Sequence, residues 1–115
     1  MNKELLLGIV YFFVGQVLVW YQSNSQFVWD WWKDKPVITA LIYSIPISLL
    51  FWYGTKHIYD STSQLWTARF LGFGMGYLTF PILTYYYLNE SMFTTKTLLC
   101  TALAVMILLI QVFWK

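Results

Sequence analysis

Four long apolar stretches, separated by short polar segments, dominate the pattern of hydrophobic and polar residues along the chain. They cover approximately residues 5–21, 37–53, 65–88 and 93–114. A helix that crosses the hydrocarbon core of a bilayer needs about 20 residues, with a range of roughly 17–25. All four stretches are long enough. The pattern therefore predicts an all-α, polytopic protein with four transmembrane helices in a compact bundle, an integral membrane protein that crosses the lipid bilayer several times.

The polar segments leave no room for a second unit, so we expect residues 1–115 to form a single four-helix transmembrane domain. Short connections make successive helices antiparallel neighbours. Pro36 suits the start of the second helix, where its missing N–H costs no hydrogen bond. The N-terminus also has another interpretation. Lys3, the first apolar stretch and "SNS" at residues 23–25 resemble a secretory signal peptide.

Composition strengthens the membrane interpretation and excludes other classes of protein. The chain is 59% hydrophobic and only 10% charged, whereas charged residues make up about 25% of a typical soluble domain. The net charge of +2 is too small to indicate a nucleic-acid partner. Cys100 is the only cysteine, so no disulfide within the chain is expected.

The sequence indicates neither a metal site, nor a cofactor, nor an enzymatic reaction. His57 and Asp60 are close in sequence, but a metal site needs further ligands. No group of residues has the pattern of a nucleophile with its base, or of an acid–base pair. We therefore expect a protein that is not an enzyme and that uses no cofactor.

The segment "FVWDWWKDKP", residues 27–36, mixes aromatic and charged residues in a way that suits a membrane surface. Tryptophan favours the headgroup layer, where its ring is in apolar surroundings while its N–H stays hydrated. We predict an interfacial loop at residues 22–36 and a tryptophan belt at the helix ends. The alternative is a cluster that stacks against a substrate. The belt would comprise Trp20, Trp29, Trp31, Trp32, Trp52, Trp66 and Trp114.

Basic residues are divided almost evenly between the two sides of the predicted bundle. Lysine and arginine in short loops set the orientation of a membrane protein. Near balance predicts dual topology and an antiparallel homodimer, although the first helix alone can also impose one orientation. One side carries Lys3, Lys56, Arg69 and Lys115, and the other carries Lys33, Lys35 and Lys96.

Local motifs in all four stretches resemble those of one transporter family. "LLLGIVYFFVG" is an apolar helix with glycines, and "KPVITALIYS" has a leading proline with Tyr43 partway along. "LGFG" is a glycine-x-glycine motif in the third stretch. "YYLNESMFTTKTLLCTALAVMILLI" combines a turn with a final helix that contains small residues. Together these motifs resemble the small multidrug resistance branch of the drug/metabolite transporter superfamily.

The resemblance implies a dimeric transporter, with a cavity between the first three helices and pairing through the fourth. Two positions depart from the family pattern. The family couples transport to protons through a glutamate in the first helix, where the interior polar residue is Gln16, and an amide does not titrate near neutral pH. The family's cation-stacking tryptophan is replaced by Phe70. We therefore expect a small neutral or zwitterionic solute.

The predicted solute site combines aromatic and hydrogen-bonding side chains inside the first three helices. Gln16 needs a hydrogen-bonding partner there, and acts either as a helix contact or as a solute contact. The tyrosines either line a common cavity with Gln16 or bond to nearby backbone. The candidate solute-binding residues are Tyr11, Gln16, Tyr43, Phe70 and Tyr77.

Two further sets of residues concern helix packing and helix movement. The glycines of "GFGMG", residues 72–76, let another helix approach closely, and they also loosen their own helix. The candidate hinge or packing residues are Pro46, Gly72, Gly74, Gly76 and Pro81. A stripe along the fourth helix suits helix association within the chain or across a dimer. It comprises Thr97, Thr101, Ala104, Leu108 and Gln111, the first four being the candidate dimer contacts.

Two functions follow from these patterns. The first is a transporter-like protein that moves its solute through the cavity of a dimer. The alternative is a non-transporting accessory or structural subunit, whose exposed aromatic faces pack against a larger membrane complex. Arg69 either snorkels to the interface from the third helix or anchors an anion more deeply.

Overall fold

Helices make up nearly all of the described chain. A computed structural model describes residues 2–114. Its elements are α1 (Lys3–Val28), the short 3-10 helix η1 (Asp30–Trp32), α2 (Pro36–Thr62), α3 (Leu65–Leu88) and α4 (Thr95–Phe113). The prediction of an all-α chain with four long helices is confirmed.

Three helices, α1, α2 and α4, are long and apolar enough to cross a membrane. α3 is also long, with 24 residues, but it is not one of these three. Its sequence places glycines, threonines and tyrosines among the apolar residues, which lowers its hydropathy. By length and composition the structure thus has three membrane-crossing helices, whereas the apolar pattern predicts four.

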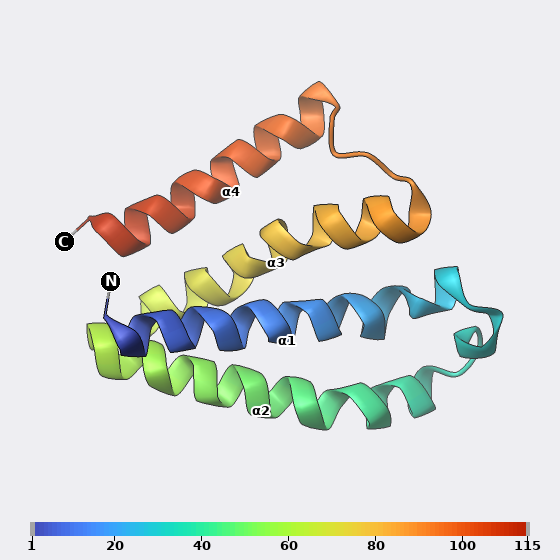
Figure 1. Cartoon of the computed structure of the whole chain (residues 1–115), viewed down its shortest axis with the longest axis horizontal. Coiled ribbons are helices and arrows are strands. Elements are labelled where there is room, and N and C mark those ends of the chain that lie inside the picture. Colours follow the sequence, from blue (N-terminus) through green and yellow to red (C-terminus); the bar gives the residue numbers. More distant parts are fainter. Residues whose placement is uncertain (1, 115) are drawn as a thin grey trace.

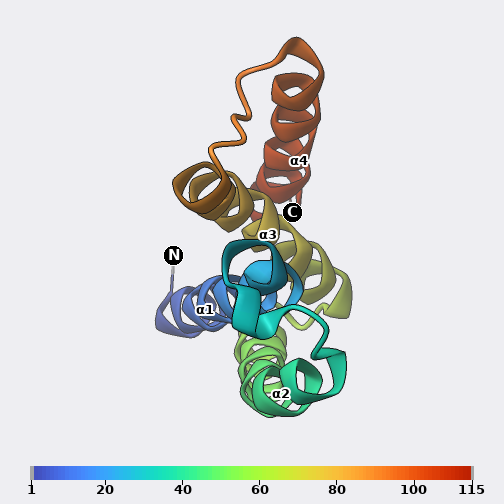
Figure 2. The ribbon, with the colours of Figure 1, turned by 90° about the vertical axis from the view of Figure 1, so that its right-hand side faces the viewer.

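The four long helices run up and down in one bundle. α1, α2 and α3 lie side by side, and α4 packs mainly against α3 (Figure 1). The end view in Figure 2 places α3 between α4 and the pair formed by α1 and α2. α4 diverges from α3 toward residue 95, so the two helices are closest toward the C-terminal end of α4 (Figure 1).

Local signals explain most of the helix ends. The Asn2 side chain accepts a hydrogen bond from the backbone N–H of Leu5 at 2.8 Å and so caps α1. Pro36 occupies the start of α2, as predicted. Ser63 and Asn89 directly follow α2 and α3. Both residues have the left-handed backbone conformation that commonly ends a helix.

Two helices extend past the predicted apolar stretches. α1 continues through residues 22–28, and α2 continues to Thr62. Helix formation depends on backbone hydrogen bonding and propensity, so a helix need not end where its apolar residues end. The predicted loop at residues 22–36 therefore shrinks to residues 29–35 around η1. α3 has the predicted bounds.

The core lies between α1, α2 and α3. It comprises Phe12, Ile58, Ala68, Leu71 and Met75. The outer surface, by contrast, is apolar: Leu41 and Ile45 are each 67% exposed, and Phe113 is 73% exposed. Apolar patches of this extent are rare on soluble proteins and suit surroundings such as lipid.

Glycines allow α1 and α2 to pack closely. A Cβ atom on Gly15 would come within 2.9 Å of the Phe51 ring, and one on Gly54 within 2.7 Å of the Phe12 ring. Small residues let helix backbones approach each other in membrane bundles, where lipid competes for every apolar contact. These glycines therefore hold α2 against α1 and help to position the side chains of the site.

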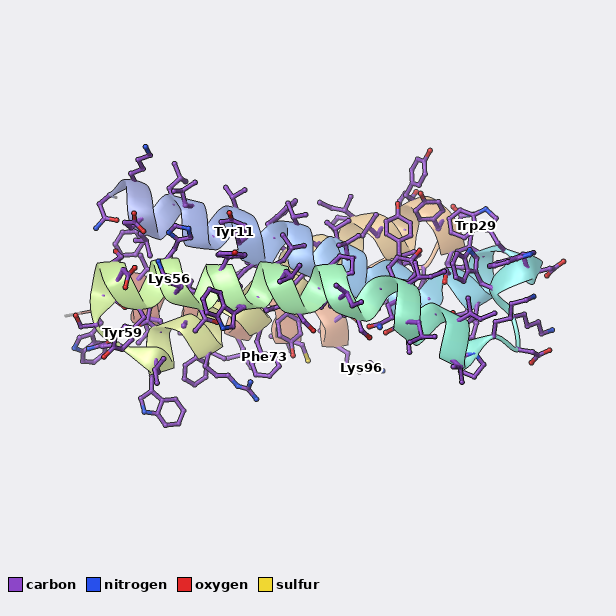
Figure 3. All side chains as sticks on the ribbon, turned by 90° about the horizontal axis from the view of Figure 1, so that it is seen from below. Tyr11, Trp29, Lys56, Tyr59, Phe73 and Lys96 are labelled. Carbon is purple, nitrogen blue, oxygen red and sulfur yellow. The ribbon has the colours of Figure 1, made fainter. Side chains whose placement is uncertain are left out.

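Most tryptophans lie at the ends of the molecule, as the belt predicts. At one end Trp29 precedes η1 and Trp31 lies within it, whereas at the other end Trp66 is the second residue of α3 and Trp114 follows α4. Figure 3 shows Trp29 and Tyr59 at opposite ends of the bundle. Trp52 departs from the belt because α2 continues well beyond it to Thr62.

The position of Trp20 contradicts the belt prediction for this residue. Its side chain is only 2% exposed, and its Nε1–H donates a hydrogen bond to Thr84 Oγ1 at 2.9 Å. The ring also stacks on Tyr87, with a centroid distance of 5.3 Å. Trp20 is therefore a contact between α1 and α3 inside the bundle. It lies away from the surface because α1 extends beyond it and because Thr84 provides the polar partner that its N–H requires.

Candidate functional site

A hollow of about 630 Å³ opens between α1, α2 and α3, near the end of the bundle where α3 begins. Binding pockets for small molecules commonly measure about 300–1,000 Å³. We call this feature the Arg69 hollow, after the one charged residue in its lining. The lining comprises Phe12 and Gln16 from α1, Phe51 and Thr55 from α2, and Leu65, Trp66, Ala68, Arg69, Gly72 and Phe73 from α3.

Gln16 crosses the floor of the Arg69 hollow. Its side-chain Nε2 donates a hydrogen bond to the backbone carbonyl of Gly72 at 2.8 Å. A Cβ atom on Gly76 would come within 3.0 Å of Gln16 Oε1, so the glycine makes room for the amide. Gln16 thus lies both in a contact between helices and in the lining of the hollow.

Arg69 supplies the positive charge of the hollow. Its guanidinium group lies 4.5 Å from the centroid of the Phe73 ring, in a cation–π contact. Within residues 2–114 the ion pairs are Lys56 with Asp60 and His57 with Glu4. The Arg69 guanidinium therefore has no carboxylate within ion-pair distance in the described chain.

A second, shallower hollow continues from the first along α2. It measures about 520 Å³ and shares Phe51 and Thr55 with the Arg69 hollow, and it also includes Trp52 and Lys56. Lys56 and Phe73 both lie in the half of the bundle away from Trp29 (Figure 3). The two hollows therefore form a continuous apolar region with basic groups at one end.

The structure separates the five predicted solute-binding residues. Gln16 lines the Arg69 hollow, and Phe70 lies beside it, stacked on Trp66 with a centroid distance of 6.0 Å. Tyr43 packs against Trp32 near the opposite end of the bundle. In the described chain, the three predicted tyrosines are not in the lining of the Arg69 hollow with Gln16.

The other two tyrosines lie on different faces of the bundle. Tyr11 stacks on Tyr53 and His57 between α1 and α2, with centroid distances of 5.9 and 5.4 Å. Tyr77 is 54% exposed and lines a hollow of about 230 Å³ between α3 and α4. Each tyrosine lies within a long helix, but the helices turn these three residues toward different neighbours.

The glycines of "GFGMG" face different helices. Gly74 packs directly against the Leu108 side chain of α4, whereas Gly76 faces Gln16 of α1. A Cβ atom on Gly72 would lie 3.6 Å from the Phe51 ring, an ordinary contact distance. Gly74 and Gly76 thus make close contacts with other helices, whereas Gly72 has room for a Cβ atom. α2 and α3 continue as helices through Pro46 and Pro81.

The stripe on α4 faces α3 of the same chain. Leu108 contacts Gly74, and Gln111 Oε1 accepts a hydrogen bond from Thr67 Oγ1 at 3.3 Å. Ala104 is the buried residue of α4, while Thr97 and Thr101 line the hollow between α3 and α4. Within one chain the stripe thus makes the intramolecular contact, one of the two associations that suit it.

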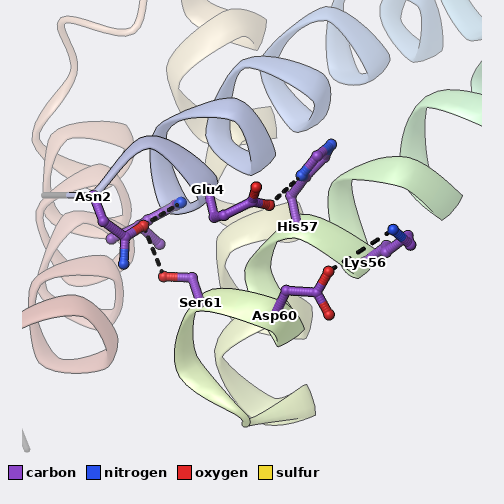
Figure 4. Close-up of polar contacts among 7 residues, drawn as sticks. Asn2, Glu4, Lys56, His57, Asp60 and Ser61 are labelled. Atoms are coloured by element: carbon purple, nitrogen blue, oxygen red, sulfur yellow. Dashed lines mark hydrogen bonds and ion pairs between the residues drawn. The ribbon is translucent and has the colours of Figure 1, made fainter.

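Polar contacts join α1 and α2 at the end of the bundle near the Arg69 hollow (Figure 4). His57 Nδ1 and the Glu4 carboxylate form a hydrogen-bonded pair, and Ser61 donates a hydrogen bond to Asn2 Oδ1 at 3.1 Å. Glu4 precedes the apolar stretch that begins at Leu5. The hydrogen bond with His57 lowers the pKa of the Glu4 carboxyl below its ordinary value.

A polar hollow of about 540 Å³ lies at the opposite end, between α1, the segment around η1 and the start of α2. Gln22, Asp34 and Lys35 are in its lining, together with Ser25. The Ser25 hydroxyl is buried and has no hydrogen-bonding partner in the described chain. The Lys35 ammonium group is already engaged, because it donates to the Trp31 carbonyl at 2.6 Å.

Of the lining of the Arg69 hollow, Phe51, Thr55 and Phe73 were not predicted from the sequence, whereas Arg69 was a candidate anion anchor. The spacing of Trp66, Arg69 and Phe73 places them on one face of a helix, so the sequence could have predicted that they lie on the same side of α3. Phe51 and Thr55 are likewise one turn apart. By contrast, no local signal pairs residues of different helices, such as the pairing of Trp20 with Thr84.

Within residues 2–114, no three histidine, cysteine, aspartate or glutamate side chains gather closely enough to hold a metal ion. No family model, no curated protein and no solved structure matches this chain. Its function must therefore be inferred from its own residues and geometry.

Proposed function

We propose that this protein is a transporter-like membrane protein that holds a small neutral or zwitterionic solute in the Arg69 hollow. One observation carries this proposal: three helices line a hollow of about 630 Å³ with aromatic rings, an amide and a guanidinium group. Mostly apolar pockets with a few placed polar groups are typical of small-molecule sites. The resemblance to the small multidrug resistance branch, which also implies a cavity between the first three helices, is consistent with it.

In this proposal α3 is a fourth membrane-spanning helix. α2 ends at one end of the bundle and α4 begins at the other, and α3 runs between them (Figure 1). Its buried residues include Thr67, Gly72, Gly74 and Thr79, so part of its polarity is turned toward other helices. Phe73 is 54% exposed and represents an outer face that suits lipid.

The topology can be tested with introduced cysteines in a Cys100→Ser background. Four spans put Asp34 and Asn89 on one side of the membrane and Ser63 on the other. All three native residues are exposed, so cysteines there can react with a membrane-impermeant thiol reagent. In the double variant Ser63→Cys/Asn89→Cys, one label per molecule from outside, in either orientation, supports four spans. Two labels on some molecules and none on the others contradict four spans.

Transport itself can be tested in proteoliposomes with radiolabelled glycine betaine and carnitine as zwitterionic probes, and glycerol as a neutral one. We expect protein-dependent uptake of at least one probe. Gly72→Phe fills the hollow and should abolish uptake. Gly72→Ala is the matched control, because its Cβ fits at 3.6 Å from Phe51. Absence of uptake for every probe, or full uptake by Gly72→Phe, contradicts the proposal.

We further propose that two copies associate as a homodimer. α4 supports this, because Ala104 is its one buried residue and most of its surface is uncovered. Near balance of basic residues allows the two copies to insert in opposite orientations. Impermeant labelling of Asp34→Cys for half of the molecules in intact cells supports this arrangement, and uniform labelling or protection contradicts it.

One observation favours a second function, that of a non-transporting subunit in a larger membrane complex. Tyr86 and Phe93 are 75% and 77% exposed, and they line a hollow of about 520 Å³ where α3 passes toward α4. Aromatic residues are enriched in protein interfaces. Stoichiometric co-purification of one partner from native membranes, lost in Tyr86→Ala/Phe93→Ala, would favour this function, and its absence would contradict it.

A further inference from the structure

We propose that the Arg69 hollow selects an amphipathic molecule whose head group contains a phosphate or a carboxylate and whose tail is apolar. The head group would bind at Arg69, and the tail would lie toward Gly72 and Phe12. This inference rests on the proposed function, since it names the chemical class of solute for the same hollow.

The first support is the state of the Arg69 guanidinium. The centroid of the Phe73 ring lies 4.5 Å from its central carbon, in a cation–π contact. A guanidinium group carries five N–H donors in a fixed fork that matches the two oxygens of a carboxylate or phosphate. With no carboxylate of the described chain in ion-pair distance, these donors are available to a ligand.

The second support is the order of polar and apolar groups along the hollow. At a rise of about 1.5 Å per residue, Arg69 lies about 6 Å closer to the start of α3 than Phe73 does. On the antiparallel α2, Thr55 is likewise about one turn closer to the same end of the bundle than Phe51. Relative to the two rings, Arg69 and Thr55 therefore lie toward that end of the bundle. Farther in, the lining includes Phe51 and Phe12, and the side-chain N–H of Gln16, one turn beyond Phe12, is already bonded to the Gly72 carbonyl. A head group near Arg69 and a tail along the Phe51 and Phe12 rings thus have separate places.

The third support is the sign of the local charge. Arg69 is the charged residue in the lining, and Lys56 adds a second basic group in the adjoining hollow. Lys56 is 3.8 Å from Asp60, but both side chains are exposed, so water and salt screen that pair. A purely cationic head group would meet repulsion at Arg69, and an uncharged one would gain no ion pair.

Binding can be measured on the full chain in a neutral glycoside detergent, by native mass spectrometry that counts bound molecules. The probes share a twelve-carbon tail: dodecylphosphocholine carries a phosphate, whereas dodecyltrimethylammonium and dodecanol do not. We expect saturable binding of one dodecylphosphocholine per chain, about tenfold tighter than either other probe. Equal binding of the three probes would overturn the proposal.

Variants assign that selectivity to the guanidinium group. Arg69→Gln should weaken binding of dodecylphosphocholine about tenfold or more, because charged hydrogen bonds are lost. The affinity of Arg69→Lys for dodecylphosphocholine should lie between those of the native protein and Arg69→Gln, since lysine keeps the charge but lacks the forked arrangement of N–H donors. Lys96→Gln, at the far end of α4, is the matched control and should bind normally. Unchanged selectivity in Arg69→Gln, with native helix content by circular dichroism, would overturn the proposal.

Competition distinguishes an amphiphile from a soluble anion. Free phosphocholine and inorganic phosphate lack the tail and should compete only weakly. Effective competition by either one would overturn the amphiphile assignment. The experiments distinguish a failure of the proposed transport from a failure of this inference. Selective binding without uptake contradicts the proposed transport but leaves this inference intact. Uptake of glycerol that is unaffected by Arg69→Gln overturns this inference and leaves the transport function intact.

Discussion

The side-chain Nε2 of Gln16 donates a hydrogen bond to the backbone carbonyl of Gly72 across 2.8 Å. This bond joins α1 to α3 at the floor of the Arg69 hollow, where both residues are in the lining. Here the first helix contributes an amide, whose role in the structure includes holding two walls of the hollow together.

Gln16→Leu should lower the free energy of unfolding by about 0.6–2 kcal/mol, the usual contribution of a hydrogen bond between membrane helices. The loss should be modest because a carbonyl within a helix also accepts a bond from its own backbone. Unfolding in bicelles by titration with sodium dodecyl sulfate measures it. Gln26→Leu is the control, since Gln26 donates only to the nearby Ser23 carbonyl. An equal effect of both substitutions would contradict a special role for Gln16.

Thr84→Val should cost more, about 1–3 kcal/mol of unfolding free energy, because it leaves the buried Nε1–H of Trp20 without its partner. In Trp20→Phe the donor is removed, so adding Thr84→Val to that variant should cost little more. The same unfolding titration of both single variants and the double variant gives the coupling between the residues. Strictly additive costs would show that the hydrogen bond does not contribute.

Two neighbouring glycines should respond differently to alanine. At Gly74 a Cβ atom would lie 2.6 Å from Leu108 Cγ, so Leu108 or α4 must shift, at about 1–3 kcal/mol. Gly72→Ala meets Phe51 at 3.6 Å and should be neutral or stabilising, by up to about 1 kcal/mol. Unfolding titrations compare the two variants. Leu108→Ala should relieve the cost of Gly74→Ala, and a cost that remains unchanged would contradict the contact between α3 and α4.

The Glu4–His57 pair should make the contact between α1 and α2 sensitive to acid. The folded-state pKa of Glu4 is lowered, so its contribution to stability is present above the ordinary glutamate pKa and is lost as the pH falls through the folded value. Glu4→Gln should remove this pH dependence, whereas Glu90→Gln should retain it. Unfolding midpoints measured from neutral to acidic pH test the prediction, and the same acid-induced loss in Glu4→Gln would refute it.

The sequence by itself determined the helical class and most helix positions, because these depend on neighbours along the chain. The third apolar stretch predicts the bounds of α3, and Pro36 predicts the start of α2. The far ends of α1 and α2 were less predictable. A helix continues on backbone hydrogen bonds after its apolar residues stop, so residues 22–28 became part of α1.

Only the tertiary structure decided which side chains meet. Helical periodicity shows which residues share a face of one helix, but the rotation of each helix about its axis depends on its contacts with the others. Tyr11 and Tyr43 therefore lie apart from Gln16 although all three seemed suited to one cavity. For the same reason Arg69 was assigned to the Arg69 hollow only by the packing of α1, α2 and α3 around it.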